Sequence, residues 1–281
     1  MKNFKVNYRL EGEAGKIKAH SHIEYEIYLF HKGTCRYLIH NQIYDLQPGD
    51  ILLMDGLALH KPNVPINSEY IRSHVHFAPH SIETLLSSLN ASSLLDVFHK
   101  LGHCLIRTTN KQEVNKLAGL IKQMSEINHE PMSKQEQEWE LKALLVQVLI
   151  IVNRLGNTSS IKVISKKLDK TWQAERIATY IQQHFHEKLS IDKIATQLNL
   201  SKSYVSHVFK EMTGFTVMEY VMACRLKQVQ YLLEVEERKT LQQIADESGF
   251  ESVSHLSRFF KKQMGITAKT YRMERLKIFK E

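Results

Sequence analysis

Apolar and polar residues alternate along the first part of the chain, from about residue 16 to residue 80. Tyr, Ile and Val recur at every second position in short segments that end at Gly, Pro or Asn: IEYEIYLF, CRYLIHN, QIYDL, QPGDILLM and YIRSHVHF. A period of two places successive side chains on opposite faces of a strand. The pattern therefore predicts a small antiparallel β-barrel or sandwich.

After residue 80 the apolar residues follow the period of helices. We predict helices over 81–101, 111–129 and 134–155, and Pro131 separates the last two into a helical hairpin. The segment 134–155 carries an apolar stripe with two candidate uses, packing against the barrel or contact with a second subunit. Periodicity supports both uses equally.

A polar and basic stretch, GNTSSIKVISKKLDKT, follows the hairpin at residues 156–171, and the remainder of the chain is predicted to be helical. The predicted fold is therefore an α+β protein of two domains. A β-barrel with a helical hairpin occupies residues 1–156, a linker occupies 157–171, and an all-α domain occupies 172–281.

The all-α domain contains the same stretch twice. IATQLNLSKSYVSHVFKEMTGFTVMEY begins at Ile194, and IADESGFESVSHLSRFFKKQMGITAKTY begins at Ile244. Matching residues are offset by 50 positions before the central turn and by 51 after it, as a turn of variable length would produce. A duplicated helical unit in a basic domain is typical of two helix-turn-helix motifs, which we place at about 189–211 and 240–262.

Local signals indicate where the helices of these motifs begin and turn. Ser190 and Ser201 are predicted N-caps, because a short hydroxyl side chain accepts a hydrogen bond from the first helical turn. Asn199 and Gly249 stand where a tight turn needs a left-handed residue.

The second helix of each motif has a small, polar and basic face. In the first copy this face holds Ser203, Ser206, His207 and Lys210, and the equivalent face of the second copy holds Ser254, Ser257, Arg258 and Lys261. Short hydroxyl side chains allow close approach to base edges, and arginine binds guanine through two hydrogen bonds. An ordinary solvated helix explains one such face equally well, whereas two faces in register favour DNA.

These faces supply the candidate DNA contacts. Base contacts are predicted for Ser203, Ser206, His207, Ser254, Ser257 and Arg258. Phosphate contacts, which give affinity and register without sequence information, are predicted for Lys202, Lys210, Lys261, Lys262 and Lys269.

The net charge of +8 is concentrated in the same part of the chain. Residues 1–156 hold 17 Lys and Arg against 16 Asp and Glu, whereas residues 157–281 hold 21 against 14. Such asymmetry indicates an acidic partner for the second half.

The three cysteines are scattered without a CxxC pair, and no apolar run approaches the roughly 20 residues that span a bilayer. We expect a soluble, cytoplasmic protein that makes no membrane contact.

The second copy, GFESVSHLSRFFKKQMGITAKTYR, resembles the C-terminal signature of the AraC/XylS family of transcription regulators. The first copy, followed by EYVMACRLKQVQYLL, resembles the first helix-turn-helix of that family and its long connecting helix. The resemblance covers about residues 172–276. It departs from the family at Ala268, where a proline is usual, and at His255 and Leu256, which replace a common aromatic pair.

The resemblance implies a regulator that binds promoter DNA and contacts RNA polymerase. It matches the six predicted base-contact residues to base-contacting positions of the family, and it assigns Arg225 on the connecting helix a structural role. It also implies a homodimer formed through the helices that follow the barrel.

The barrel segment carries its own candidate binding residues. HSHIEYEIYLFHKG spaces His20, His22, Glu26 and Gly33 in a pattern similar to the first cupin motif, and QPGD followed by His60 is similar to a reduced second motif. We therefore expect a cupin-like barrel that binds a small organic effector such as a sugar. The candidate pocket residues are His20, His22, Glu26, Tyr28, Arg36 and His60.

Two other interpretations of the same residues stay open. In the first, the candidate pocket residues only stabilise the barrel mouth. In the second, a divalent metal is bound by His20, His22, Glu26 and His60, because imidazole and carboxylate are suitable ligands for it. His74 and His76 lie on another predicted strand, and we expect only one of them to face a shared pocket. The effector pocket is the preferred interpretation, and no cofactor is expected.

Together these features predict a sequence-specific transcription regulator, an activator controlled by a small-molecule effector, without enzymatic activity. The alternative is a metal-dependent cupin enzyme with a DNA-targeting domain, which the HxHxxxE spacing motivates.

Overall fold

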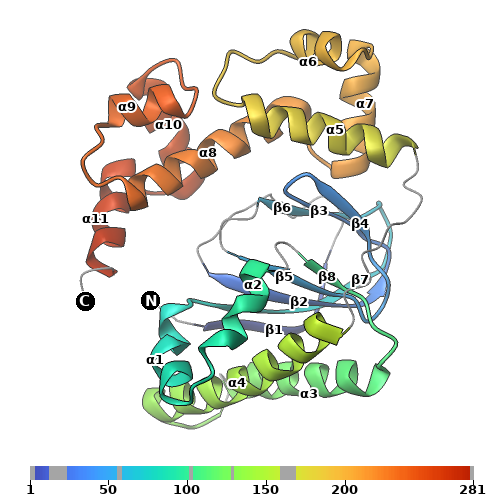
Figure 1. The fold of residues 1–281 in the computed structure, drawn as a ribbon, viewed down its shortest axis with the longest axis vertical. Coiled ribbons are helices and arrows are strands. Elements are labelled where there is room, and N and C mark those ends of the chain that lie inside the picture. The colour runs from blue at the N-terminus through green and yellow to red at the C-terminus, as the bar shows by residue number, and fades with distance from the viewer. Residues whose placement is uncertain are drawn as a thin grey trace. The chain divides into compact units, whose positions relative to one another are not determined.

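The computed structural model describes residues 4–12, 24–55, 59–100, 104–127, 130–158 and 169–278. The chain forms two compact units, Met1–Lys166 and Lys167–Glu281 (Figure 1). Most of the predicted linker lies outside the described residues. Its described ends differ from the prediction, because residues 157–158 complete one helix and residues 169–171 begin the next.

The first unit is built on two antiparallel sheets, as the alternating pattern predicts. The Tyr28 and Tyr37 rings, one from each sheet, lie 5.2 Å apart between their centroids, so the two sheets face each other as the walls of a small barrel. The five-stranded sheet has the order β1 (Phe4–Glu11), β7 (Tyr70–Phe77), β2 (Tyr25–Gly33), β5 (Ile51–Met54) and β8 (Cys104–Ile106). The three-stranded sheet has the order β4 (Gln42–Asp45), β3 (Arg36–Ile39) and β6 (His60–Asn63).

Strand β2 divides its side chains between two apolar cores. Ile27 and Leu29 pack with the helices of this unit, whereas Tyr28 and Phe30 face the barrel interior. Because both faces of the strand are covered, the five residues from Glu26 to Phe30 are all buried. The alternation thus decides which residues line the interior.

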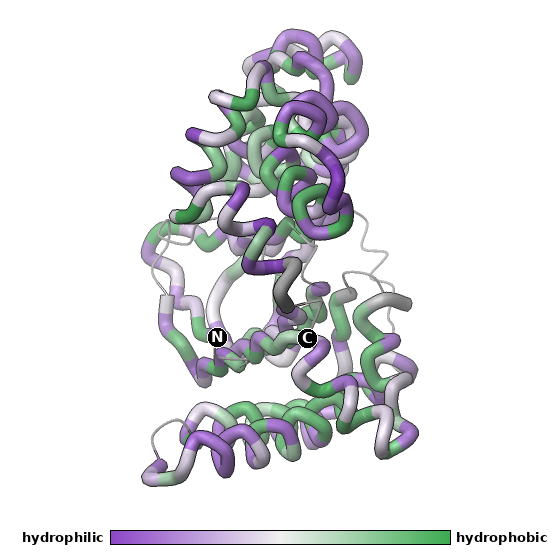
Figure 2. Tube along the Cα trace, turned by 90° about the vertical axis from the view of Figure 1, so that its left-hand side faces the viewer, coloured by the Kyte–Doolittle hydropathy of each residue, from purple (hydrophilic) through white to green (hydrophobic). Residues whose placement is uncertain are grey.

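Helices cover the outer face of the five-stranded sheet (Figure 1). The apolar stripe of α4 (Lys134–Thr158) lies in the same core as the sheet. Hydrophobic and hydrophilic residues alternate along these helices in Figure 2. The stripe residues of α4 that are buried there are Leu141, Leu145, Val148, Leu149 and Val152. The helices of this unit are α1 (His80–Ser88), α2 (Asp96–Lys100), α3 (Lys111–Ile127) and α4 (Lys134–Thr158).

The single helix predicted over 81–101 is wrong. Helix α1 ends at Ser88, a short 3-10 turn occupies Ser92–Leu95, and α2 follows. Asn90 between them has a φ of 53°, a left-handed conformation that no continuous helix contains.

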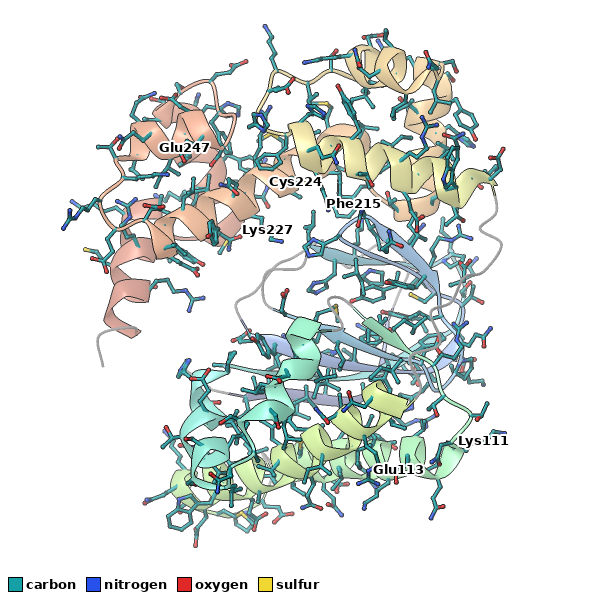
Figure 3. The ribbon with its side chains drawn as sticks, in the orientation of Figure 1. Lys111, Glu113, Phe215, Cys224, Lys227 and Glu247 are labelled. Carbon is teal, nitrogen blue, oxygen red and sulfur yellow. The ribbon has the colours of Figure 1, made fainter. Side chains whose placement is uncertain are left out.

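The second unit consists of helices, as predicted. Helices α6 and α7 form the first helix-turn-helix, and α9 and α10 form the second, with α8 between them. Phe215, just before α8, packs on Tyr220 at 5.4 Å between ring centroids, and Cys224 on α8 is buried (Figure 3). The helices are α5 (Asp169–His184), α6 (Ile191–Leu198), α7 (Lys202–Thr213), α8 (Val217–Val235), α9 (Leu241–Glu247), α10 (Val253–Met264) and α11 (Ala268–Ile278).

The predicted caps and turns of the first motif are confirmed. The Ser190 hydroxyl accepts from the Lys193 N–H and the Ser201 hydroxyl from the Tyr204 N–H, each at 3.2 Å. Asn199 is left-handed, with a φ of 55°. Such hydrogen bonds satisfy N–H groups that have no partner within the helix.

The loop between α5 and α6 holds the two motifs together. Arg225 of α8 donates from Nε to the Phe185 carbonyl and from Nη2 to the Glu187 carbonyl, both at 2.8 Å. The turn of the second motif packs on the same loop, since a Cβ added at Gly249 would lie 2.8 Å from the His186 Cα. We call this arrangement of loop, arginine and glycine turn the Arg225 clamp. It agrees with the structural role predicted for Arg225.

None of the helices in the described ranges is long and apolar enough to cross a membrane.

Candidate functional site

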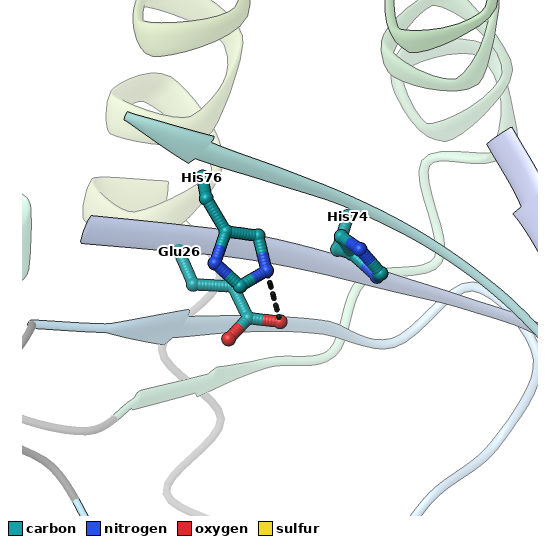
Figure 4. Close-up of side chains that lie close together, drawn as sticks. All are labelled: Glu26, His74 and His76. Atoms are coloured by element: carbon teal, nitrogen blue, oxygen red, sulfur yellow. Dashed lines mark ion pairs between the residues drawn. The ribbon is translucent and has the colours of Figure 1, made fainter. Parts of the chain in front are cut away.

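A cluster of one carboxylate and three imidazoles lies inside the barrel. Glu26 on β2 faces His76 on β7 at 3.5 Å between Oε1 and Nε2 (Figure 4). It also faces His60 on β6 at 3.3 Å between Oε2 and Nε2. These three side chains are at most 7% exposed. The antiparallel register of β2 and β7 brings Glu26 and the two histidines of β7 together. Glu26 pairs with His76, and the next inward position on β2, Tyr28, pairs with His74.

The expectation that only one of His74 and His76 faces a shared pocket is wrong. Their ring centroids are 4.8 Å apart, and both rings lie beside Glu26 (Figure 4). Residues two apart on a strand point to the same face, so the pair turns inward together. The half-buried His74 also contacts the Asn7 side-chain amide, at 2.8 Å from Nδ2 to Nε2.

Tyrosines line the rest of the interior. The Tyr28 hydroxyl donates to the Tyr70 hydroxyl at 3.0 Å, and the Tyr37 ring stacks on His60 at 6.3 Å between centroids. Burial is the main cause that raises the pKa of Tyr28, Tyr37 and Tyr70 above the usual value. These hydroxyls are therefore neutral at physiological pH, and the interior offers hydroxyl, imidazole and carboxylate groups to a polar ligand.

The structure brings together three of the predicted pocket residues, Glu26, Tyr28 and His60. Arg36 is not among them: its Nε binds the Asp45 carboxylate at 2.9 Å, and it alternates with Tyr37, which faces the interior. His20 and His22 lie outside the described residues. The prediction missed the inward-facing His74, Tyr37 and Tyr70. For His74 the signal was its period-two spacing from His76, which places both on one face of β7.

A buried ion pair joins two segments of the barrel away from the cluster. Arg107 on the chain after β8 donates from Nε and Nη2 to the Asp50 carboxylate at 2.8 Å and 2.6 Å. The Asp50 hydrogen bond raises the pKa of Arg107. The pair fastens β8 to the turn between β4 and β5, away from the interior cluster.

The predicted DNA-contact residues lie on the outer faces of α7 and α10. Ser203, His207, Ser254 and Arg258 are exposed, and Ser206 and Ser257 are partly exposed. The opposite faces are anchored by buried side chains, Val205, Val208 and Phe209 on α7 and Leu256 and Phe260 on α10. The five predicted phosphate-contact lysines are also exposed: Lys202, Lys210, Lys261, Lys262 and Lys269.

The contacts that these surface residues make are weak enough to give way to DNA. Lys202 pairs with Asp192 at 2.8 Å, and His207 lies 3.4 Å from Glu211. Exposed pairs of this kind contribute about 0–1 kcal/mol, so breaking them costs little. Helix α7 therefore presents polar side chains that can turn toward a ligand.

Comparison with known families decides the classification. The family model of the AraC-like ligand binding domain matches residues 11–164, more than half of the chain, and that of a helix-turn-helix domain matches residues 194–274. The chain belongs to the AraC family. It is an AraC-type DNA-binding transcription regulator with an N-terminal ligand-binding domain.

The curated proteins to which the chain is similar include a transcriptional regulator and an operon regulatory protein. The chain is 23% identical over 260 residues to the uncharacterized HTH-type transcriptional regulator YdeC of Bacillus subtilis, covering 92% of this chain and 87% of YdeC. It is also 23% identical over 258 residues to the Msm operon regulatory protein of Streptococcus mutans, covering 89% and 84%. Among solved structures, the C-terminal domain of the response regulator AraT from Geobacillus stearothermophilus is 29% identical, with a TM-score of 0.36 and coverage of 37% of this chain and 85% of that domain.

Proposed function

We propose that this chain is a sequence-specific regulator whose binding to promoter DNA is controlled by a small polar effector inside the barrel. The observation that carries the proposal is the pair of polar faces on α7 and α10, which correspond position for position at an offset of 51 and belong to motifs joined by the Arg225 clamp. Each face suits a major groove, and two successive grooves on one side of a duplex lie about 34 Å apart.

The two faces differ, so the DNA site is asymmetric. The first offers Ser203, Ser206 and His207, whereas the second offers Ser254, Ser257 and Arg258. Arg258 is held to its own helix by one long contact, 3.3 Å from Nε to the Ser254 carbonyl. Its guanidinium is thus the best candidate for a bidentate contact with guanine.

Replacing Arg258 with Ala should relax one base position of the preferred site and cost about 1–3 kcal/mol there. The measurement is selection of binding sequences from a random duplex pool by the full chain and by the variant. Lys262→Ala is the matched control, because loss of a phosphate contact weakens all sequences alike and lowers the salt dependence. A uniform loss in Arg258→Ala would make Arg258 a phosphate contact instead.

The barrel interior supports the effector part of the proposal. Neutral tyrosine hydroxyls, imidazoles and the Glu26 carboxylate are groups that bind hydroxyl-rich molecules such as sugars. The effector would shift the populations of the regulator's conformations and thereby its affinity for DNA. Activation through RNA polymerase and dimerisation through the helical layer belong to the same proposal.

A thermal-shift screen of small polar metabolites, sugars included, tests effector control. A ligand that binds only the folded chain raises its melting temperature, and Tyr28→Phe should reduce that shift because it removes one hydroxyl from the interior. Tyr204→Phe, on α7, is the control and should leave the shift intact.

A reporter driven by the selected sequence completes the test. The same ligand should change reporter output through the full chain. Ligand-dependent output from a chain that lacks residues 1–156 would contradict control through the barrel.

A further inference from the structure

Three potential metal ligands meet inside the barrel on two neighbouring strands. Glu26, His74 and His76 each offer one ligand atom, and these atoms all lie within 4.8 Å of one another. The strand register sets this meeting, since β2 and β7 pair Glu26 with His76 and Tyr28 with His74. Imidazole nitrogen and carboxylate oxygen together suit divalent ions of the first transition series.

We propose that Glu26, His74 and His76 form a binding site for a divalent transition-metal ion. Two of the three ligands come from β7, so this set differs from His20, His22, Glu26 and His60, which the motif spacing suggested. The difference follows from the strand register, which motif spacing alone does not contain.

The distances approach those of a coordinated ion. Metal–nitrogen and metal–oxygen bonds of about 2.0–2.2 Å place neighbouring ligand atoms about 3–3.5 Å apart. Glu26 Oε1 and His76 Nε2 are already 3.5 Å apart. The separations that involve His74 are at most 4.8 Å, so this half-buried side chain must move closer to bind the same ion (Figure 4).

Neighbouring residues hold the ligands in place. The second carboxylate oxygen of Glu26 lies 3.3 Å from His60 Nε2. The Asn7 amide lies 2.8 Å from His74 Nε2; with the amide turned over, its oxygen would accept the Nε2–H and leave Nδ1 to bind the ion. Outer contacts of this kind orient metal ligands in proteins.

Three protein ligands leave coordination positions open, as in sites where a further molecule binds the metal. A polar effector can then contact the ion directly, and only this last step rests on the proposed function. Metal binding itself requires neither DNA nor an organic ligand, so it can be tested separately.

Cobalt titration of the full chain, freed of metal by a chelator and dialysis, tests the site. We expect saturable binding of one Co²⁺, with a visible absorption band from nitrogen and oxygen ligands and a rise in melting temperature. His74→Gln and His76→Gln should each weaken Co²⁺ binding at least tenfold, since outer contacts alone are typically worth on the order of 10–100-fold. His31→Gln is the control and should bind Co²⁺ unchanged, because His31 bonds to Ser73, outside the cluster.

His74 is half-buried, so its replacement by Gln should leave the metal-free melting temperature close to that of the parent chain. Absence of saturable Co²⁺ binding by the parent chain overturns the proposal. So does an affinity that falls in His60→Gln but not in His74→Gln, which would assign the ion to the ligands suggested by the motif. Selection of DNA sequences by the same variants reports on the proposed function independently of these outcomes.

Discussion

Replacing Arg107 with Ala will lower the free energy of unfolding by about 3 kcal/mol. Asp50 is 1% exposed, and its carboxylate receives two hydrogen bonds from the Arg107 guanidinium. Without the arginine, a buried negative charge keeps the Gln47 N–H at 2.7 Å but loses its cationic partner. The expected loss of stability is at the lower end of the range of about 3–5 kcal/mol for a broken buried ion pair, because the Arg107 side chain is 21% exposed.

Chemical denaturation of the parent chain and the variant measures this loss. Arg154→Ala is the matched control, since Arg154 also pairs with a carboxylate, Glu113, at 2.9 Å, but its side chain is 51% exposed. That pair, whose Glu113 side chain is 18% exposed, should contribute about 1 kcal/mol, less than the pair with the 2% exposed Asp50 side chain. Adding Asp50→Asn to Arg107→Ala should recover part of the loss by removing the buried charge. Equal losses in the two arginine variants, or no recovery, would contradict the electrostatic explanation.

Gly249→Ala should destabilise the second unit by about 3 kcal/mol, from left-handed strain combined with overpacking. Gly249 has a φ of +77°, and an added Cβ would lie 2.8 Å from the Phe185 carbonyl and from the His186 backbone. Neither neighbour is a flexible side chain, so the turn and the loop must separate.

The chain supplies its own control for this prediction. Gly265 also has a φ of +77°, yet an added Cβ there meets nothing within 4 Å. Gly265→Ala should therefore cost only the strain of a left-handed alanine, about 1 kcal/mol. Denaturation of both variants isolates the contact between the turn and the loop. Equal costs would show that this contact adds nothing to stability.

Features set by nearby residues could be predicted from the sequence. The Ser190 and Ser201 caps and the left-handed Asn199 each depend on residues three or four positions away, so the local pattern was sufficient. The polar faces of α7 and α10 followed from the helical period in the same way.

Features that depend on distant residues were harder to predict. Motif spacing brought Glu26 and His60 into one predicted site, but the pairing of β2 with β7 that adds His74 and His76 is a property of the sheet. Asp50 and Arg107 lie 57 positions apart, and Arg225 and Phe185 lie 40 positions apart. Hydropathy patterns describe only neighbouring positions, so they predict neither contact. His74 is the exception, because the period-two rule alone places it on the same face of β7 as His76.

The Arg225 clamp has a consequence for the promoters that this regulator would control. If α7 and α10 keep a constant separation, one base pair inserted between their contact sites rotates the second site by about 34° around the duplex axis. A base substitution removes one contact, whereas such an insertion misplaces every contact of one helix. Promoter sites should therefore drift in base identity over evolutionary time while the length between their two halves stays constant.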